Sequence, residues 1–331
     1  MRKLLLLTVL LAAFGILAFG CGKSGGKSKS SDKGKISIAV IPKGTTHEFW
    51  KSIHAGAIKA SRELGVDITW KGPLKEDDRE EQNQIVETFI SSGVSAIVLA
   101  PLDDRSLIQP VRAAKGKGIP TVIIDSGLQE NYHASFVATD NYRGGTLAAD
   151  RLGELIKGKG KIIMLRYQEG SASTTEREKG FMDTVKSKFP GIEVLSENQY
   201  AGATTETAYT ASENLLNRFK TPDAIFTPNE SSTFGCLRAL QDRGLAGKIT
   251  FVGFDSSVKL VEALQKGEIK GLVLQNPFKM GYLGVKTAAA ILKGEPYEKR
   301  IDTGVTIATP QNMNDPEIKQ LLSPDLSEYL K

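Results

Sequence analysis

The sequence predicts an α/β protein with two doubly wound domains, each built around a parallel sheet. The chain has 331 residues, and at roughly 100–200 residues per domain this length suits two domains. From residue 35 onward, short and almost continuously apolar β-rich runs alternate with amphipathic helical stretches. Strands of this kind are typical of parallel sheets that carry helices on both faces. The alternation occurs in both halves of the chain, which indicates two domains of similar design.

The chain begins with a segment typical of export rather than of a folded core. Two basic residues precede an apolar run at residues 4–19, which is shorter than the roughly 20 apolar residues that a membrane span needs. Cys21 follows a small residue and resembles the cysteine of a bacterial lipobox, although Ala18 stands where leucine is more usual. We expect residues 1–20 to be a lipoprotein signal peptide and Cys21 to be lipidated. The alternative is an ordinary secretory protein with a chance cysteine.

The composition of residues 21–35 predicts a flexible tether, because glycine, serine and lysine dominate it and residues 22–35 contain no apolar side chain. Most of the basic charge lies in this N-terminal part. Residues 1–35 carry a formal charge of +6, whereas the whole chain carries +5. Residues 36–331 therefore carry a formal charge of −1. A chain-wide basic surface for binding nucleic acid is therefore excluded.

The predicted elements follow one another in a regular order. In the first half, four strands are predicted, at residues 36–42, 66–72, 96–101 and 121–125. Three helical patterns separate them: one at 49–64, a second that ends near residue 90, and a third at 106–114. In the second half, helical patterns again separate four strands, at 161–167, 192–198, 224–229 and 249–255. Glycine and proline at 118–120 mark a turn before one of these strands.

Polar residues recur where the predicted strands end. They occur at 43–47, at Asp125 and Ser126, at Asn229 and Glu230, and at 255–257. Each cluster alone is typical of loops and helix caps. Ligands of doubly wound sheets bind outside the carboxyl ends of the strands, so the recurrence of such clusters favours a binding site there.

Motifs of enzymes are missing from the sequence. There is no HExxH or CxxC motif, and the glycine, lysine and serine at 22–24 lack the first glycine of a phosphate-binding loop. The three histidines have no spacing typical of a metal site, and Cys236 lies in a helical stretch that suits a core residue. We expect neither catalysis nor a cofactor or metal.

Seven sequence blocks occur in order and carry a family resemblance: IPKGTTHEFWKSIHAGA, IPTVIIDSG, FVATDNYRGG, TEREKGF, TPNESSTFGCLRALQ, FVGFDSS and LVLQNPFKMG. Together they resemble the ribose-type, sugar-binding branch of the type I periplasmic binding proteins, which serve as ABC transporter substrate-binding lipoproteins. The resemblance implies two Rossmann-like lobes joined by a three-strand hinge. It places residues 36–139 plus 276–304 in the N-terminal lobe, and 140–275 plus 305–331 in the C-terminal lobe. Lactose-type repressors share this fold, but a signal and tether replace their helix-turn-helix.

The resemblance also implies a set of ligand-binding residues in the cleft. They are Lys43, His47, Phe49, Trp50, Asp125, Ser126, Arg177, Asn229, Asp255 and Gln275. Carboxylates, amides and guanidinium groups suit a polyol, since each hydroxyl both donates and accepts hydrogen bonds. We expect Trp50 to stack on the sugar, the alternative being a core residue.

This sequence departs from the ribose binders at several of these positions. Lys43 and His47 replace shorter polar residues, and Ser126 replaces an arginine. The aromatic residue expected from the second lobe aligns with Ala203, where Tyr200 is a substitute. A pentose, a hexose, a cyclitol and a furanosyl signal therefore remain open as ligands.

The function implied is that of a monomeric, lipid-anchored extracytoplasmic receptor. It would deliver a monosaccharide or cyclitol to a membrane ABC permease and bind no nucleic acid. One alternative is a sensory receptor for a sugar or furanosyl signal. A less favoured one is an exported carbohydrate-active enzyme, for which Asp125 and Asp255 are the obvious acid–base pair.

Overall fold

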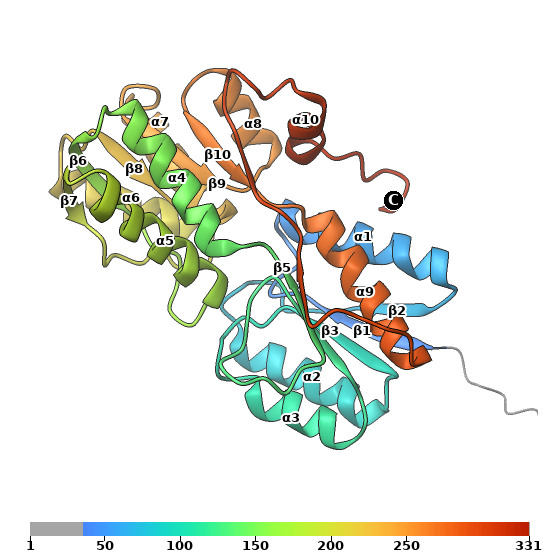
Figure 1. The fold of residues 1–331 in the computed structure, drawn as a ribbon. Helices are drawn as coiled ribbons and strands as arrows, with labels where there is room; N and C mark the ends of the chain where they lie inside the picture. The colour runs from blue at the N-terminus through green and yellow to red at the C-terminus, as the bar shows by residue number, and fades with distance from the viewer. Residues whose placement is uncertain (1–35, 331) are drawn as a thin grey trace, which may run out of the picture. The chain divides into compact units, whose positions relative to one another are not determined.

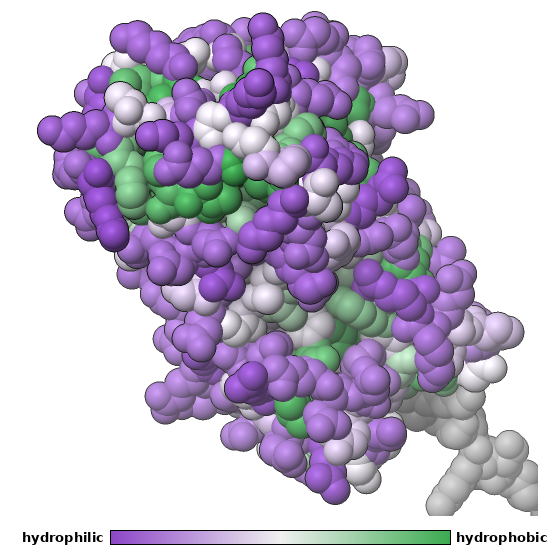
Figure 2. Space-filling model, turned by 60° about the vertical axis from the view of Figure 1, so that its left-hand side comes forward, coloured by the Kyte–Doolittle hydropathy of each residue, from purple (hydrophilic) through white to green (hydrophobic). Residues whose placement is uncertain are grey.

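The computed structural model describes residues 36–330, and these residues belong to one compact unit. The predicted signal peptide, the tether and Cys21 lie outside the described residues. No helix within 36–330 is long and apolar enough to cross a membrane. Hydrophilic residues cover most of the face drawn in Figure 2, and apolar residues appear there mainly in the hollows between them.

The first lobe is built on a fully parallel six-stranded sheet (Figure 1). Its strands, in spatial order, are β11 (Arg300–Asp302), β5 (Ser135–Ala138), β4 (Thr121–Ile124), β3 (Ala96–Leu99), β1 (Ser37–Ile41) and β2 (Asp67–Trp70). Helices α1 (Glu48–Leu64) and α9 (Pro277–Lys293) cover one face, and α2 (Arg79–Ser92) and α3 (Ile108–Gly116) cover the other.

Strand β1 shows why the apolar runs form buried strands. Ile38 and Val40 pack with α1 and α9, whereas Ala39 and Ile41 pack with α2. Successive side chains of a strand point to opposite faces, so a strand covered on both sides has to be apolar throughout. Helices α1 and α9 approach each other very closely, because a Cβ atom on Gly56 would lie 2.0 Å from the carbonyl oxygen of Phe278.

The second lobe has a mixed sheet in the order β12, β10, β9, β8, β6, β7. The strands are β12 (Thr306–Ala308), β10 (Gly271–Leu274), β9 (Thr250–Phe254), β8 (Ala224–Phe226), β6 (Lys159–Met164) and β7 (Gly191–Ser196), with β12 antiparallel to β10. Helices α4 (Asn141–Leu155) and α5 (Ala172–Lys188) cover one face. The other carries α6 (Thr205–Arg218), α7 (Glu230–Asp242), α8 (Val258–Gln265) and α10 (Pro316–Leu322). Cys236 is buried in this core, as expected.

The chain passes between the two sheets three times, after β5, after β10 and between β11 and β12. Two of these crossings lie side by side, where the hydroxyl oxygens of Thr139 and Thr303 are 3.3 Å apart. The prediction of two α/β lobes is thereby confirmed. The end of the chain returns to the first lobe, since the Tyr329 ring packs against Phe278 at 5.5 Å. Residues 305–331 are expected in the second lobe, and the described part of this segment, up to residue 330, contacts both lobes.

Candidate functional site

Residues from both lobes line a small cavity of about 30 Å³ at the carboxyl ends of the strands. The cavity brings together every residue that the resemblance implied except Ser126. Ser126 lies just behind it, where its hydroxyl accepts a hydrogen bond from the backbone N–H of Ser173 in the opposite lobe. The walls also include residues that the sequence analysis did not propose as ligands: Glu76, Tyr167, Ser173, Thr174 and Glu230.

A buried ion pair forms the floor on the first-lobe side. Lys43 follows β1 and Asp125 follows β4, and their Nζ and Oδ2 atoms are 2.8 Å apart. Lys43 also donates across the cleft to the hydroxyl of Ser173 at 3.2 Å. The backbone of Asp125 is left-handed, with φ of 60°, a conformation that aspartate and asparagine tolerate better than most residues. The parallel sheet thus brings the ends of separate strands to one point.

Arg177 is almost completely buried and reaches the cavity from α5. Its Nε donates to Asn141 Oδ1 at 2.8 Å, and its Nη1 donates to the carbonyl oxygen of Pro228 at 2.9 Å. Burial lowers the pKa of Arg177, while the charge of Asp255, 3.9 Å away, opposes this shift. The remaining nitrogen, Nη2, is buried without a hydrogen-bond partner among residues 36–330. It is a donor available to a ligand.

Asp255 and Gln275 form the corresponding polar pair at the ends of β9 and β10. Gln275 Nε2 donates to Asp255 Oδ1 at 2.7 Å, and the backbone N–H of Glu230 donates to Oδ2 at 3.1 Å. Burial raises the pKa of Asp255, although Arg177 and Gln275 act against the shift. Gln275 Oε1 is buried and lacks a hydrogen-bond partner within the described part of the chain. It is an acceptor available to a ligand.

Asn229 lines the cavity but also caps a helix. Its side chain accepts from the backbone N–H of Ser232 and forms a capping box at the start of α7. The capping role that is usual for such a residue therefore applies here.

Glu76 organises one side of the cavity and was not anticipated. Its carboxylate is buried and accepts hydrogen bonds from Trp50 Nε1 at 2.7 Å and from the hydroxyl of Tyr167, in the other lobe, at 2.8 Å. It also pairs with His47 Nδ1. Burial would raise the pKa of Glu76, but its hydrogen bond and ion pair with His47 lower it to about 2. Burial would lower the pKa of His47, yet Glu76 raises it to about 9.

Three aromatic residues line the cavity, namely the expected Phe49 and Trp50 and, in addition, Tyr167. Trp50 directs its indole N–H to the cavity, but its ring packs in the first-lobe core and the residue is only 2% exposed. Phe49 lines the cavity and meets Trp50 edge to face, with ring centroids 4.9 Å apart. The aromatic residue supplied by the second lobe is Tyr167, whereas Tyr200 stacks on Arg166 instead.

Glu230 links the lobes through the start of a helix. It is the first residue of α7, and its carboxylate accepts from the backbone N–H groups of Glu48 and Phe49, at 3.3 and 3.1 Å. These groups belong to the first turn of α1 in the other lobe, where helices leave N–H groups unpaired. Burial raises the pKa of Glu230 to about 7, against the opposing charge of His47.

The ion pair of His47 and Glu76 predicts a loss of stability at alkaline pH. Because the pKa of His47 rises from 6.5 to about 9 on folding, its contribution is complete below pH 6.5 and disappears as the pH rises to 9. We expect the free energy of unfolding to fall by at most about 3 kcal/mol over this range. Chemical unfolding at pH 6, 8 and 9.5 measures this.

His47→Gln should flatten that dependence. His54→Gln is the matched control, since burial lowers the pKa of His54 and its contribution changes only below pH 6.5. An unchanged slope in His47→Gln would contradict the prediction.

Comparisons with known proteins agree with this geometry. A family model described as a periplasmic binding protein domain matches residues 38–296. A carbohydrate transporter solute-binding protein from Agrobacterium radiobacter, solved with D-arabinose, is 36% identical in sequence to this chain. The two structures superpose with a TM-score of 0.84 over 88% of this chain and 100% of the other chain. A solute-binding protein from Agrobacterium vitis with bound D-fucose is 35% identical, covers 87% and 100%, and has a TM-score of 0.84.

The ribose import binding protein of Bacillus subtilis is 26% identical over 85% of this chain and 90% of its own length. These relatives are sugar-binding transport proteins and not enzymes. The chain therefore belongs to the type I periplasmic binding protein family, in its sugar-binding branch.

Proposed function

We propose that this protein is a lipid-anchored receptor that captures a neutral sugar or cyclitol between its lobes and delivers it to an ABC permease. Members of its family act outside the cytoplasm. The observation that carries the proposal is the pair of free polar atoms in the cavity, the donor Arg177 Nη2 and the acceptor Gln275 Oε1. The hydroxyls of a sugar both donate and accept hydrogen bonds, so a sugar offers partners to both kinds of atom. The bound D-arabinose and D-fucose of two relatives support this class of ligand.

The charges around the cavity favour a neutral ligand. Three cationic side chains, Lys43, His47 and Arg177, face the acidic Glu76, Asp125, Asp255 and Glu230. Phosphorylated or acidic sugars would need a surplus of positive charge and of donors, which this set does not provide. Neutral monosaccharides and polyols should therefore bind better than sugar phosphates.

Capture requires the lobes to open. Pockets that hold small molecules usually measure about 300–1,000 Å³, whereas this cavity has about 30 Å³. The lobes are held together by bonds such as Tyr167 to Glu76 and Gln168 Nε2 to the Glu76 carbonyl oxygen, each 2.8 Å. A ligand that contacts both lobes stabilises the closed form, and the three crossings supply the hinge. A permease could distinguish the closed form from the open one.

A thermal-shift screen of residues 36–331 tests the proposal. D-arabinose, D-fucose, D-ribose, xylitol and myo-inositol are compared with D-ribose 5-phosphate. At 100 times Kd, a ligand should stabilise the protein by about 2.7 kcal/mol, which shifts the midpoint by several degrees. X-ray scattering should show a smaller radius of gyration with the ligand that binds. A panel without any shift, or binding without compaction, would contradict the receptor mechanism.

Cys21→Ser should release the protein from the membrane while leaving its sugar binding intact. A lipid chain contributes about 0.8 kcal/mol per buried CH₂ group, and residues 22–35 offer no apolar substitute. Membrane fractionation after expression in a bacterial host that processes lipoproteins measures this, with Cys236→Ser as the control. Retention of Cys21→Ser in the membrane fraction would argue against the lipid anchor.

A further inference from the structure

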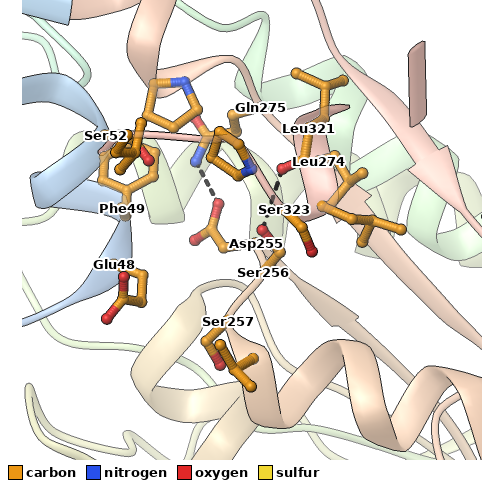
Figure 3. Close-up of a pocket in the computed structure, with 15 residues that line it drawn as sticks. Glu48, Phe49, Ser52, Asp255, Ser256, Ser257, Leu274, Gln275, Leu321 and Ser323 are labelled. Carbon is orange, nitrogen blue, oxygen red and sulfur yellow. Dashed lines mark hydrogen bonds between the residues drawn. The ribbon is translucent and has the colours of Figure 1, made fainter. Parts of the chain in front are cut away.

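A second pocket, drawn in Figure 3, has a volume of about 170 Å³. It is bounded by the start of α1, by the loop that follows β9, and by the C-terminal segment around Leu321 and Ser323. Phe49, Asp255 and Gln275 line both spaces. This side pocket and the ligand cavity are therefore adjacent, with these three side chains between them.

The C-terminal wall of the side pocket is fixed to both lobes. On the second lobe, Leu322 is buried in the core and the hydroxyl of Ser256 donates to the carbonyl oxygen of Leu321 at 3.3 Å. On the first lobe, Arg62 Nη1 donates to the carbonyl oxygen of Glu328 at 3.1 Å, and its guanidinium lies over the Tyr329 ring. The pocket is thus a built feature of the closed molecule.

The lining is partly apolar and favours an uncharged group. Its apolar walls include Phe49, Leu274, Leu321, Leu322, Leu326 and the exposed Val258. The charged side chains among the described lining residues, Glu48 and Asp255, are both acidic, so an anion would be repelled. A cavity of about 150 Å³ is known to hold benzene, so this pocket is large enough for an aryl ring, and uncharged serines contribute to its polar side.

We propose that the side pocket is a subsite for a neutral alkyl or aryl substituent of the sugar, so that the natural ligand is a glycoside rather than a free monosaccharide. The inference rests on the proposed function, because the sugar ring itself is placed in the central cavity. Asp255 and Gln275 then hold the hydroxyls nearest to the substituent, and Phe49 packs against its first carbon atoms.

Titration calorimetry with D-fucose, methyl β-D-fucopyranoside, phenyl β-D-fucopyranoside and D-fucose 1-phosphate tests the subsite, with the same series for D-galactose. Phenyl glycosides should bind roughly tenfold more tightly than the free sugar, because the ring buries apolar surface. The phosphate should bind more weakly than the free sugar. Rejection of the phenyl glycoside by a protein that binds the free sugar would overturn the subsite.

Two substitutions that fill the side pocket distinguish its contribution to ligand affinity from the contribution of the central cavity. Ser323→Phe fills it from the C-terminal segment, and Ser257→Phe fills it from the start of α8. Both should abolish the advantage of the phenyl glycoside and leave the free sugar's affinity within about twofold. Ser327→Phe is the matched control, since Ser327 is exposed and lies outside the pocket lining.

An equal effect of Ser323→Phe and Ser257→Phe on the free sugar and on the glycoside would overturn the subsite. Thermal unfolding of each variant confirms that the fold is intact. Failure of the proposed function would appear differently, as an absence of binding by every free sugar in the thermal-shift panel.

Discussion

Glu76→Ala is expected to raise the Kd for the bound sugar by about 10- to 150-fold. The bond from the Tyr167 hydroxyl to the Glu76 carboxylate crosses between the lobes, and a charged hydrogen bond of this kind contributes about 1.5–3 kcal/mol. The substitution also leaves the buried Trp50 N–H without its acceptor and removes the partner of His47. Most of the loss should appear in the dissociation rate, because the bond forms only when the lobes meet.

Stopped-flow binding and calorimetry measure this effect. Glu76→Gln keeps an acceptor oxygen but loses the charge, so it should fall between the wild type and Glu76→Ala. Glu80→Ala is the matched control, since Glu80 is an exposed acidic residue nearby in the first turn of α2. Wild-type affinity in Glu76→Ala would contradict the prediction and mean that the contacts of Glu76 with the second lobe do not contribute to sugar binding.

Asp125→Asn is expected to weaken sugar binding by a similar factor of about 10 to 150 and to lower stability as well. Asparagine is the suitable replacement, because the left-handed backbone of Asp125 would penalise alanine. The change leaves Lys43 buried without a charged partner at 2.8 Å, and breaking a buried pair costs up to about 3–5 kcal/mol.

The double variant Lys43→Met with Asp125→Asn separates the two effects. It should recover most of the stability, because no unpaired charge remains buried, but it should not recover sugar affinity. Chemical unfolding and calorimetry on the two single variants and the double variant provide the comparison. Recovery of both stability and affinity in the double variant would show that Asp125 does not contact the ligand.

The candidate site is predictable from the sequence where its residues adjoin strands. Lys43, Asp125, Asn229 and Asp255 directly follow apolar runs, and this position alone predicts that they lie at the carboxyl end of a sheet. Arg177 lies within a helix, and only the family resemblance indicates its role. All of these residues line one cavity, and their contact with a ligand remains a prediction.

Glu76 could not be found in this way. It lies in the run KEDDREE at residues 75–81, whose charge is typical of a solvated surface. The signal that separates Glu76 from its neighbours is its burial beneath Tyr167 and Gln168 of the other lobe, about 90 residues further along the chain. A local pattern contains no information about such a contact.

The sequence by itself determined the order and type of most elements, because the apolar periodicity of a strand or helix is a local property and is independent of its partner. It did not single out β5, β10, β11 and β12, which adjoin the crossings between the lobes. Of these, β11 and β12 are paired with strands far away in the sequence, and a local pattern does not show such pairing. The tertiary structure alone decided the protonation of the site. The pKa values of His47, Glu76 and Glu230 depend on which charges burial brings together, and that requires both lobes to be in place.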